Sequence, residues 1–183
     1  MCSQNVCSAE HAGILDNAIR RLLHNPDKIL SGLVKPGQTA LDVGCGPGFF
    51  TIAMARMVGD GGRVIAVDLQ QGMLDKARAK AAGQGLDSRI SFHKCESDRI
   101  GVDEQVDFAL AFYMVHEVPD PAKFLAEVFG LLKPGGLMLL VEPKFHVSVS
   151  AFGKTVKIAQ GLGFEVVSQP RIVLSRSVVL KHA

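Results

Sequence analysis

Short apolar runs alternate with longer amphipathic segments from Thr39 onward, and this alternation limits the possible folds more than any other feature of the sequence. Each apolar run has the length of a strand and is rich in β-branched, aliphatic or aromatic residues. Several runs are apolar at successive positions, as in strands that are covered on both faces. The runs are 39–44 (TALDVG), 63–68 (RVIAVD), 90–95 (ISFHKC), 106–112 (VDFALAF) and 137–142 (LMLLVE).

The segments between these runs have the periodicity of amphipathic helices. Strands that alternate with crossover helices run parallel to one another. The sequence therefore predicts a doubly wound α/β sheet with helices on both faces. The expected helices cover about 48–58, 71–82, 121–132 and 151–161.

The two ends of the chain break this alternation. Residues 13–24 have the pattern of an amphipathic helix that stops where Asn25 precedes Pro26, and a short second helix follows in PDKILSGL. At the C-terminal end, FEVVSQPRIVLSRSVVLKH holds two β-rich runs with no helix-length segment between them. These runs predict a hairpin with an antiparallel last strand and a turn either near Pro170 or near Ser175–Ser177.

Length and composition limit the class of protein. A chain of 183 residues is about the size of one domain. No apolar run is long enough to cross a bilayer, and the N-terminus lacks the basic start and apolar segment of a secretory signal. We therefore expect a cytoplasmic protein without membrane insertion. Its net charge of +2 comes without a basic block, so no nucleic-acid partner is expected.

The stretch ALDVGCGPGFF forms the most informative turn, because it links the first predicted strand to a helix. Ligands of open α/β sheets bind at the carboxyl ends of the strands, where such a turn lies. The pyrophosphate fingerprint G-x-G-x-x-G is not met, since Phe49 stands at the position of the third glycine. Asp68 ends the second strand and suits the paired hydroxyls of a ribose. The two features together predict a nucleoside site.

Four segments resemble the ordered motifs of class I S-adenosylmethionine-dependent methyltransferases. They are LDVGCGPGFFTIAMA, VIAVDLQQGMLDKAR, VDFALAFYMVHEVPDP and LLKPGGLMLLVEP, which together cover about residues 35–145. The likeness is greatest to the small-molecule methyltransferases that include the quinone-biosynthesis C-methyltransferases. The resemblance implies methyl transfer from S-adenosylmethionine to a small molecule, by a monomer or a homodimer.

The resemblance also implies the architecture. It is a single Rossmann-like methyltransferase domain over 1–183, with a seven-stranded, mostly parallel sheet in the order 3-2-1-4-5-7-6 and one antiparallel strand. Residues 1–34 would form a helical lid, and residues 35–183 would form the cofactor-binding core.

The resemblance assigns cofactor contacts to residues at the strand ends. Gly44, Cys45 and Gly46 would lie along the methionine and ribose portion of S-adenosylmethionine, with Asp42 near its amino group. Asp68 would accept both ribose hydroxyls.

Further along the chain, the same likeness assigns contacts with the adenine ring and with the methyl group. Leu69 would pack on the adenine. The family commonly has Gly-Asp-Ala after the third strand, where this chain has Cys95-Glu96-Ser97. Glu96 would therefore take the adenine amino group, with Ser97 as its small neighbour and Asp98 as the alternative acid. After the fourth strand, Phe112 and Tyr113 would line the cofactor near the methyl group.

Candidate catalytic residues follow the fourth and fifth strands. His116 has the one side chain whose unperturbed pKa lies near neutrality, so it is a candidate base, and a histidine that only hydrogen-bonds a loop is the alternative. Tyr113, the only tyrosine, would contact the substrate or serve packing alone. Glu142 would contact the substrate or a loop, or form a salt bridge.

The N-terminal segment would close the site as a lid. It would offer a pair of arginines to an anionic substrate, although a solvated helix face also explains them. Its polar residues are His11, Asp16, Asn17, Arg20 and Arg21. Only about ten residues follow the fifth strand before the next helix, so the acceptor pocket would be shallow, closed by the N-terminal helices or completed by a second subunit.

The sequence leaves three other functions as alternatives. An NAD-type oxidoreductase is disfavoured by Phe49. A binding module would keep the cofactor pocket without turnover. A metalloid methyltransferase would use Cys2, Cys7 and Cys95, although none of the four cysteines, which include Cys45, has the C-x-x-C spacing of a zinc site. We expect reduced thiols and no metal. The chain also lacks a Ser-His-Asp motif, which methyl transfer does not require, because alignment of the reacting atoms supplies much of the rate.

Overall fold

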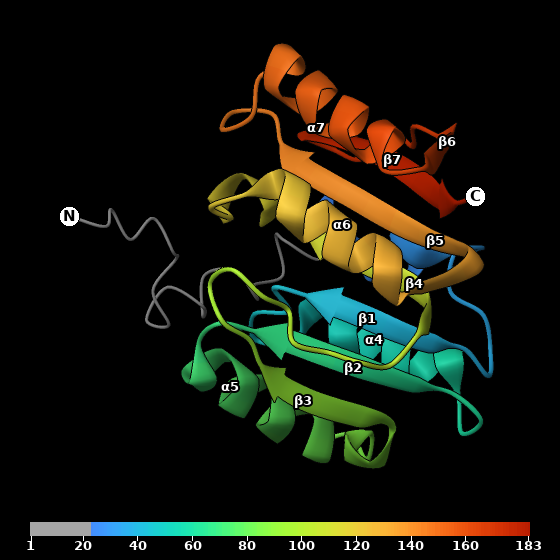
Figure 1. Ribbon diagram of the computed structural model, residues 1–183. Helices are drawn as coiled ribbons and strands as arrows, with labels where there is room; N and C mark the ends of the chain where they lie inside the picture. The colour runs from blue at the N-terminus through green and yellow to red at the C-terminus, as the bar shows by residue number, and fades with distance from the viewer. Residues whose placement is uncertain (1–22) are drawn as a thin grey trace.

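The computed structural model describes residues 23–183, and all seven strands of these residues belong to one sheet (Figure 1). The strand order is β3-β2-β1-β4-β5-β7-β6, which confirms the order expected from the sequence. β7 is antiparallel to both of its neighbours, and the pairs from β3 to β5 are parallel. The strands are β1 (Thr39–Val43), β2 (Arg63–Asp68), β3 (Ile90–Lys94), β4 (Val106–Phe112), β5 (Leu132–Pro143), β6 (Phe164–Ser168) and β7 (Ser175–His182).

Helices cover both faces of the sheet, as predicted (Figure 1). On one face, Leu110 of β4 belongs to a core that it shares with α3, α4 and α5. On the other face, Ala109 and Ala111 belong to a core that they share with α6 and α7. This alternation is the period of two that a strand imposes on its side chains. The helices are α3 (Pro26–Leu30), α4 (Phe49–Val58), α5 (Gln71–Ala82), α6 (Pro121–Leu131) and α7 (Val149–Gly161).

β5 begins earlier than the sequence predicts. We expected a strand over 137–142, but β5 starts at Leu132, directly after α6. Leu132 pairs with Val106, and the register then shifts before Leu137 pairs with Phe108. The Lys-Pro-Gly-Gly segment reads as a turn in sequence, whereas in the structure it is an irregularity within one strand. This arrangement lets β5 begin without a loop.

The connection from β3 to β4 has no regular helix in residues 95–105. Its backbone is held by Glu127 of α6, whose carboxylate accepts hydrogen bonds from the amides of Ile100 (3.0 Å) and Gly101 (2.9 Å). Ile100 is buried in the core on the α6 side. One acidic side chain therefore holds this crossover against the sheet.

The C-terminal hairpin resolves the alternative that the sequence left open. Residues 169–174 connect β6 to β7, so the turn lies at Pro170 and the segment Ser175–Ser177 is already part of β7. Leu174, the last residue of the turn, has φ +56°. A backbone conformation in this region is uncommon for a residue other than glycine.

The N-terminal part of the described chain packs on α4. The short helix predicted in PDKILSGL is α3. Its Leu30 is fully buried, and Val34, which follows the helix, is also buried. The predicted helix over 13–24 and the polar lid residues His11, Asp16, Asn17, Arg20 and Arg21 lie outside the described residues, apart from the last two positions of that helix. Within residues 23–183 no helix has the length and apolarity needed to span a membrane.

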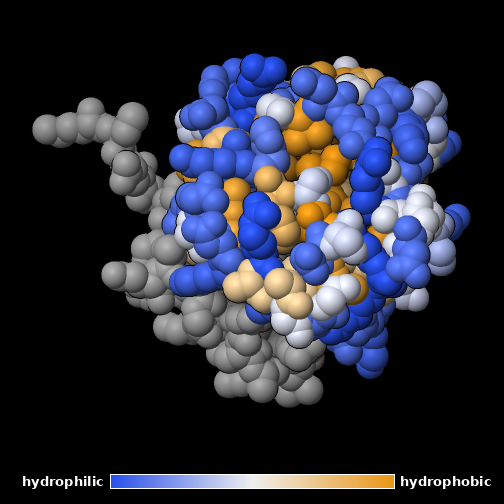
Figure 2. Space-filling model, turned by 90° about the horizontal axis from the view of Figure 1, so that it is seen from below, coloured by the Kyte–Doolittle hydropathy of each residue, from blue (hydrophilic) through white to orange (hydrophobic). Residues whose placement is uncertain are grey.

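Apolar side chains reach the surface in more than one part of the molecule. Seen from below, on the side of β3 and α5, apolar side chains are visible between hydrophilic ones (Figure 2). The large apolar side chains that are most exposed among residues 23–183 belong to other elements. They are Leu23, Phe145, Val149, Val166, Val167, Val173 and Leu174.

Candidate functional site

The three glycines of the turn between β1 and α4 all have positive φ, but a side chain at each would meet different surroundings. A Cβ at Gly44 would lie 3.0 Å from the Cβ of Met114, and one at Gly48 would lie 3.0 Å from the Cβ of Ala77 in α5. Among residues 23–183, and apart from its own chain neighbours, a Cβ at Gly46 would have no atom within 4 Å. Gly44 and Gly48 therefore permit close packing, whereas Gly46 faces open space at the carboxyl end of β1.

Asp68 ties this turn to the end of β2. Its Oδ2 accepts a hydrogen bond from the amide of Gly46 (2.8 Å), and its Oδ1 accepts one from the amide of Gln70 (2.9 Å). Burial raises the pKa of the Asp68 carboxyl, and the backbone hydrogen bonds act in the opposite direction. The amide of Leu69 also interacts with this carboxyl, and because a carboxylate has four acceptor positions, it can still accept from a ligand. Asp68 is thus oriented beside the open face of Gly46.

Asp42 lies within β1 and contacts the first turn of α4. Its Oδ2 accepts a hydrogen bond from the hydroxyl of Thr51 at 2.6 Å, and both side chains are buried. The pair fixes the start of α4 relative to β1. No local pattern in the sequence indicates the contact with Thr51.

Residues at the end of β3 approach Asp68 through the backbone. The amide of Cys95 donates to the carbonyl of Asp68 at 3.1 Å. Glu96 and Ser97 are exposed. Asp98, the alternative acid, accepts a hydrogen bond from Lys123 Nζ at 2.8 Å, and this partner lowers the pKa of the Asp98 carboxyl. The ion pair directs Asp98 towards α6.

The two described cysteines are both thiols. Burial raises the pKa of the Cys45 thiol, and it raises that of Cys95 to about 11. Both groups are therefore protonated at neutral pH, and a protonated thiol is a poor nucleophile and metal ligand. Among residues 23–183, no group of three or more His, Cys, Asp and Glu side chains has the arrangement of a metal site. Cys2 and Cys7 lie outside the described residues.

Phe112 and Tyr113 leave β4 towards the α4 side of the sheet. The ring of Phe112 is 4.4 Å from that of Phe50, centroid to centroid. The Tyr113 hydroxyl lies 2.5 Å from Ser175 Oγ and 3.2 Å from His24 Nε2. Tyr113 also has φ +62°. Its side chain therefore joins the end of β4 to the start of β7, a contact between residues that are distant in sequence.

His116 and Glu142 form a hydrogen-bonded pair at the ends of β4 and β5. His116 lies in a short 3₁₀ helix, Val115–Glu117, and its Nδ1 is 2.5 Å from Glu142 Oε2. The amide of His116 also donates to Glu142 Oε1 at 3.2 Å. The Glu142 side chain is only 3% exposed, and that of His116 is 25% exposed. The buried carboxylate therefore holds the ring at two points.

This geometry fixes the chemistry of the ring. An ionised carboxylate only accepts hydrogen bonds, so Nδ1 carries the proton and Nε2 of the neutral ring has a free electron pair for a proton. The hydrogen bond to Glu142 raises the pKa of His116 above its ordinary value, and burial opposes this in part. Glu117 Oε1 lies 3.9 Å from Nε2. The pair can therefore accept a proton at Nε2.

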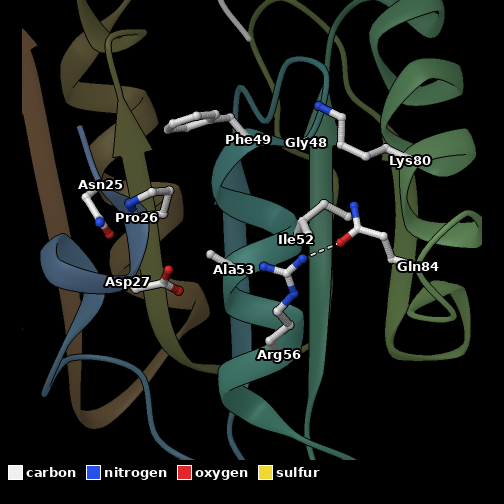
Figure 3. Close-up of a pocket in the computed structure, with 10 residues that line it drawn as sticks. All are labelled: Asn25, Pro26, Asp27, Gly48, Phe49, Ile52, Ala53, Arg56, Lys80 and Gln84. Atoms are coloured by element: carbon white, nitrogen blue, oxygen red, sulfur yellow. Dashed lines mark hydrogen bonds between the residues drawn. The ribbon is translucent and has the colours of Figure 1, made fainter. Parts of the chain in front are cut away.

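A separate hollow of about 240 Å³ lies beside α4, and neither His116 nor Glu142 lines it (Figure 3). It lies among α3, α4 and α5, and Arg56 donates a hydrogen bond to Gln84 across it. Gly48 and Phe49 line it, whereas Gly46, Asp68 and His116 do not. The hollow therefore reaches the start of α4 but excludes these three candidate site residues.

The structure brings most of the predicted site residues to one edge of the sheet. Gly44, Cys45 and Gly46 follow β1, Asp68 ends β2, and half-buried Leu69 comes next. Three partners of predicted site residues were not expected from the sequence. Thr51 contacts Asp42, and His24 and Ser175 contact Tyr113. No sequence signal identifies His24 or Ser175, because their contacts with Tyr113 span 89 and 62 residues.

Comparisons with known proteins identify the family of this chain. A model of the methyltransferase domain family matches residues 40–136, which is more than half of the chain. A demethylmenaquinone methyltransferase of Lactobacillus johnsonii is 37% identical over 110 residues, covering 60% of this chain and 45% of that protein. A ubiquinone/menaquinone biosynthesis C-methyltransferase of Marinomonas is 32% identical over 130 residues, covering 70% and 51%. The chain thus spans about half the length of these curated relatives.

A solved structure matches nearly the whole chain. The crystal structure of a SAM-dependent methyltransferase from Aquifex aeolicus has a TM-score of 0.87 and 28% sequence identity, and the match covers 97% of this chain and 100% of that one. The family model, this structural match and the seven-stranded sheet all indicate a methyltransferase fold. The chain therefore belongs to the methyltransferase domain family, as a class I member of the kind that uses S-adenosylmethionine.

Proposed function

We propose that this chain transfers a methyl group from S-adenosylmethionine to a small-molecule acceptor and releases S-adenosylhomocysteine. One observation carries the proposal. The open face of Gly46 beside Asp68 and the His116–Glu142 pair lie at the carboxyl ends of β1, β2, β4 and β5, which form one edge of the sheet. A nucleoside and a proton acceptor would meet there.

The residues at the ends of β1 and β2 fit the nucleoside portion of the cofactor. Among residues 23–183, the position of a Cβ at Gly46 is open, which leaves room for a ligand against the backbone, and the oriented Asp68 oxygens suit two ribose hydroxyls. When bound, S-adenosylmethionine supplies a methyl group on a positively charged sulfur. The residues proposed to hold it are Asp42, Gly44, Cys45, Gly46, Asp68, Leu69, Glu96, Ser97 and Phe112.

His116 would act as the general base for the acceptor. The acceptor loses a proton to His116 Nε2 as its nucleophilic atom gains the methyl group, and the proton then passes to solvent. Glu142 keeps Nδ1 protonated and fixes the plane of the ring. A base placed in this way typically contributes 10²–10⁴-fold to the rate. The Tyr113 hydroxyl is held by His24 and Ser175, which supports a role in shaping the site.

For the acceptor we propose a hydroxylated aromatic ring that is methylated on carbon. Two relatives are named for demethylmenaquinone and for ubiquinone and menaquinone biosynthesis, and the second name specifies C-methylation. Removal of a proton from a ring hydroxyl increases the electron density on the neighbouring carbon, which is the step that His116 would assist. We also propose that residues 35–183 form the core and that residues 1–34 contribute a lid, although Leu30 and Val34 pack in the core.

The test is turnover by the purified full chain. S-adenosylmethionine and a demethylmenaquinol in detergent should yield S-adenosylhomocysteine and a product methylated on ring carbon, identified by mass spectrometry and NMR. His116→Gln should lower kcat by about 10²-fold or more. His146→Gln is the matched control, because that exposed ring lies 5.8 Å from His116 without the Glu142 contact. If turnover is unaffected in His116→Gln, His116 is not the general base. A product methylated on oxygen would refute the proposal that the acceptor atom is carbon.

A further inference from the structure

Exposed apolar side chains gather where β5 ends and β7 begins. They come from two segments, the β5–α7 connection and the turn before β7, which are joined by a hydrogen bond from the amide of Lys144 to the carbonyl of Leu174 (3.0 Å). Their exposures are 68% for Phe145, 70% for Val149, 51% for Val173 and 47% for Leu174. Val149, Val173 and Leu174 line one hollow between the two segments, and exposed apolar side chains that gather in this way mark interaction sites in soluble proteins.

The same region carries only positive charge. Segments 144–152 and 169–177 contain Lys144, Arg171 and Arg176 and no Asp or Glu, whereas the whole chain has 20 Lys and Arg against 18 Asp and Glu. Lys144 and Arg171 are exposed, and Arg176 donates to the carbonyl of Val147. A hollow of about 530 Å³ opens between the two segments. We call this region the β5–β7 corner, defined by Lys144, Phe145, Val149, Arg171, Val173 and Leu174.

The turn presents its apolar residues on a fixed backbone. The amide of Ser175 donates to the carbonyl of Ile172 (3.1 Å), and Ser175 Oγ donates to that of Val173 (2.9 Å). Leu174 nevertheless has φ +56°, a region where glycine and asparagine are favoured. A strained conformation that exposes a leucine is an outlier of the kind that occurs at functional surfaces.

We propose that the β5–β7 corner docks the protein on the surface of an anionic lipid bilayer. The four apolar side chains would enter the interfacial layer, and Lys144 and Arg171 would face the anionic headgroups. A second copy of the chain fits less well, because a two-fold contact repeats the same patch on both sides and would oppose the cations to one another. The proposal does not depend on the identity of the acceptor.

Docking at this corner would bring the candidate acceptor site near the bilayer. Glu142 lies two residues before Lys144, and Glu142 pairs with Arg176 across β5 and β7. The His116–Glu142 pair therefore lies next to the corner on the same edge of the sheet. An apolar acceptor dissolved in the bilayer would reach the site without crossing water. This last step rests on the proposed function, whereas the docking itself does not.

The experiment is vesicle flotation of the full chain without cofactor or acceptor. We expect binding to vesicles of phosphatidylcholine and phosphatidylglycerol in equal parts, weakened by salt, and little binding to phosphatidylcholine alone. Each cation near an anionic bilayer strengthens binding roughly fivefold, so Lys144→Gln with Arg171→Gln should weaken it roughly 25-fold. Phe145→Ser should weaken it about tenfold. Leu174→Asn should weaken binding while keeping the thermal stability, because asparagine tolerates this backbone conformation.

Matched controls change the same residue types elsewhere. Lys35→Gln lies before β1, at the opposite edge of the sheet, and Val167→Ser is an exposed apolar residue of β6. Both should bind vesicles as the wild type does. Equal binding to neutral and anionic vesicles, or binding that the corner variants leave unchanged, would overturn the proposal. So would a loss of self-association in the corner variants without any vesicle binding by the wild type. Because flotation needs no turnover, its failure is distinct from a failure of methyl transfer.

Discussion

Gly46 and Gly48 are both glycines with positive φ, but their surroundings differ. Gly46 faces open space beside Asp68, and Gly48 lies against Ala77 of α5. Alanine at either position costs about 1–2 kcal/mol of backbone strain, because φ is positive. Only at Gly48 does the added methyl group also meet a packed neighbour, at 3.0 Å.

The two alanine variants should therefore fail in different measurements. We expect Gly46→Ala to weaken binding of S-adenosylhomocysteine with a modest loss of stability. Gly48→Ala should lose about 1–3 kcal/mol more in free energy of unfolding, because overpacking adds to the strain. Denaturant titration measures the stability, and calorimetry measures the binding. Equal stability of the two variants would refute this division of roles.

The pH dependence of the rate tests the His116–Glu142 pair. The hydrogen bond and charge of Glu142 raise the pKa of His116 above about 6.5. A base acts in its neutral form, so kcat should rise with pH through that raised pKa. In Glu142→Gln the midpoint should move to lower pH, since the anionic partner is gone, and the plateau should fall because a weaker base faces the acceptor.

A smaller shift in the same direction is expected for Glu117→Gln, whose carboxylate is a minor cause of the raised pKa. The KM for S-adenosylmethionine should stay near its wild-type value in both variants. A midpoint that does not move in Glu142→Gln would show that His116 does not control the rate.

At the scale of elements, the crossover from β3 to β4 depends on one carboxylate of α6. Glu127→Ala removes the acceptor for the amides of Ile100 and Gly101. We expect a loss of about 1–3 kcal/mol in free energy of unfolding, because amides that lose their partner in a partly buried site carry a desolvation cost. Hydrogen exchange at these two amides should accelerate more than in β4. Glu127→Gln, which keeps a carbonyl acceptor, should show the smaller effect, and unchanged exchange in Glu127→Ala would contradict the account.

The hydrophobic pattern of the sequence predicted most of the strands and helices. The apolar runs identified β1 to β4, and periodicity identified α4 to α7, because burial on the sheet imposes these patterns. It failed at the start of β5, where Pro134 and the following glycines suggest a turn although Leu132 already pairs with Val106. Likewise, His116 was predicted as a candidate base, but its orientation by Glu142 depends on the pairing of β4 with β5, which no local pattern encodes.

At the scale of the whole molecule, the parallel sheet gathers distant residues at one edge. The turn after β1, Asp68, the His116–Glu142 pair and the β5–β7 corner lie side by side in the strand order. The strand order itself followed from the family resemblance, since periodicity alone permits several orders. We expect this edge of the sheet to bind the cofactor through Asp68.

Calorimetric titration of the protein with S-adenosylhomocysteine measures this binding. The wild type should bind with a measurable heat, and Asp68→Ala should bind at least about tenfold more weakly, because charge-assisted hydrogen bonds to the ribose are lost. Asp98→Ala is the control, since that exposed acid pairs with Lys123 and should affect binding little. Thermal unfolding with and without the ligand verifies that both variants are folded. Binding by Asp68→Ala equal to that of the wild type, or no binding by the wild type, would contradict the account.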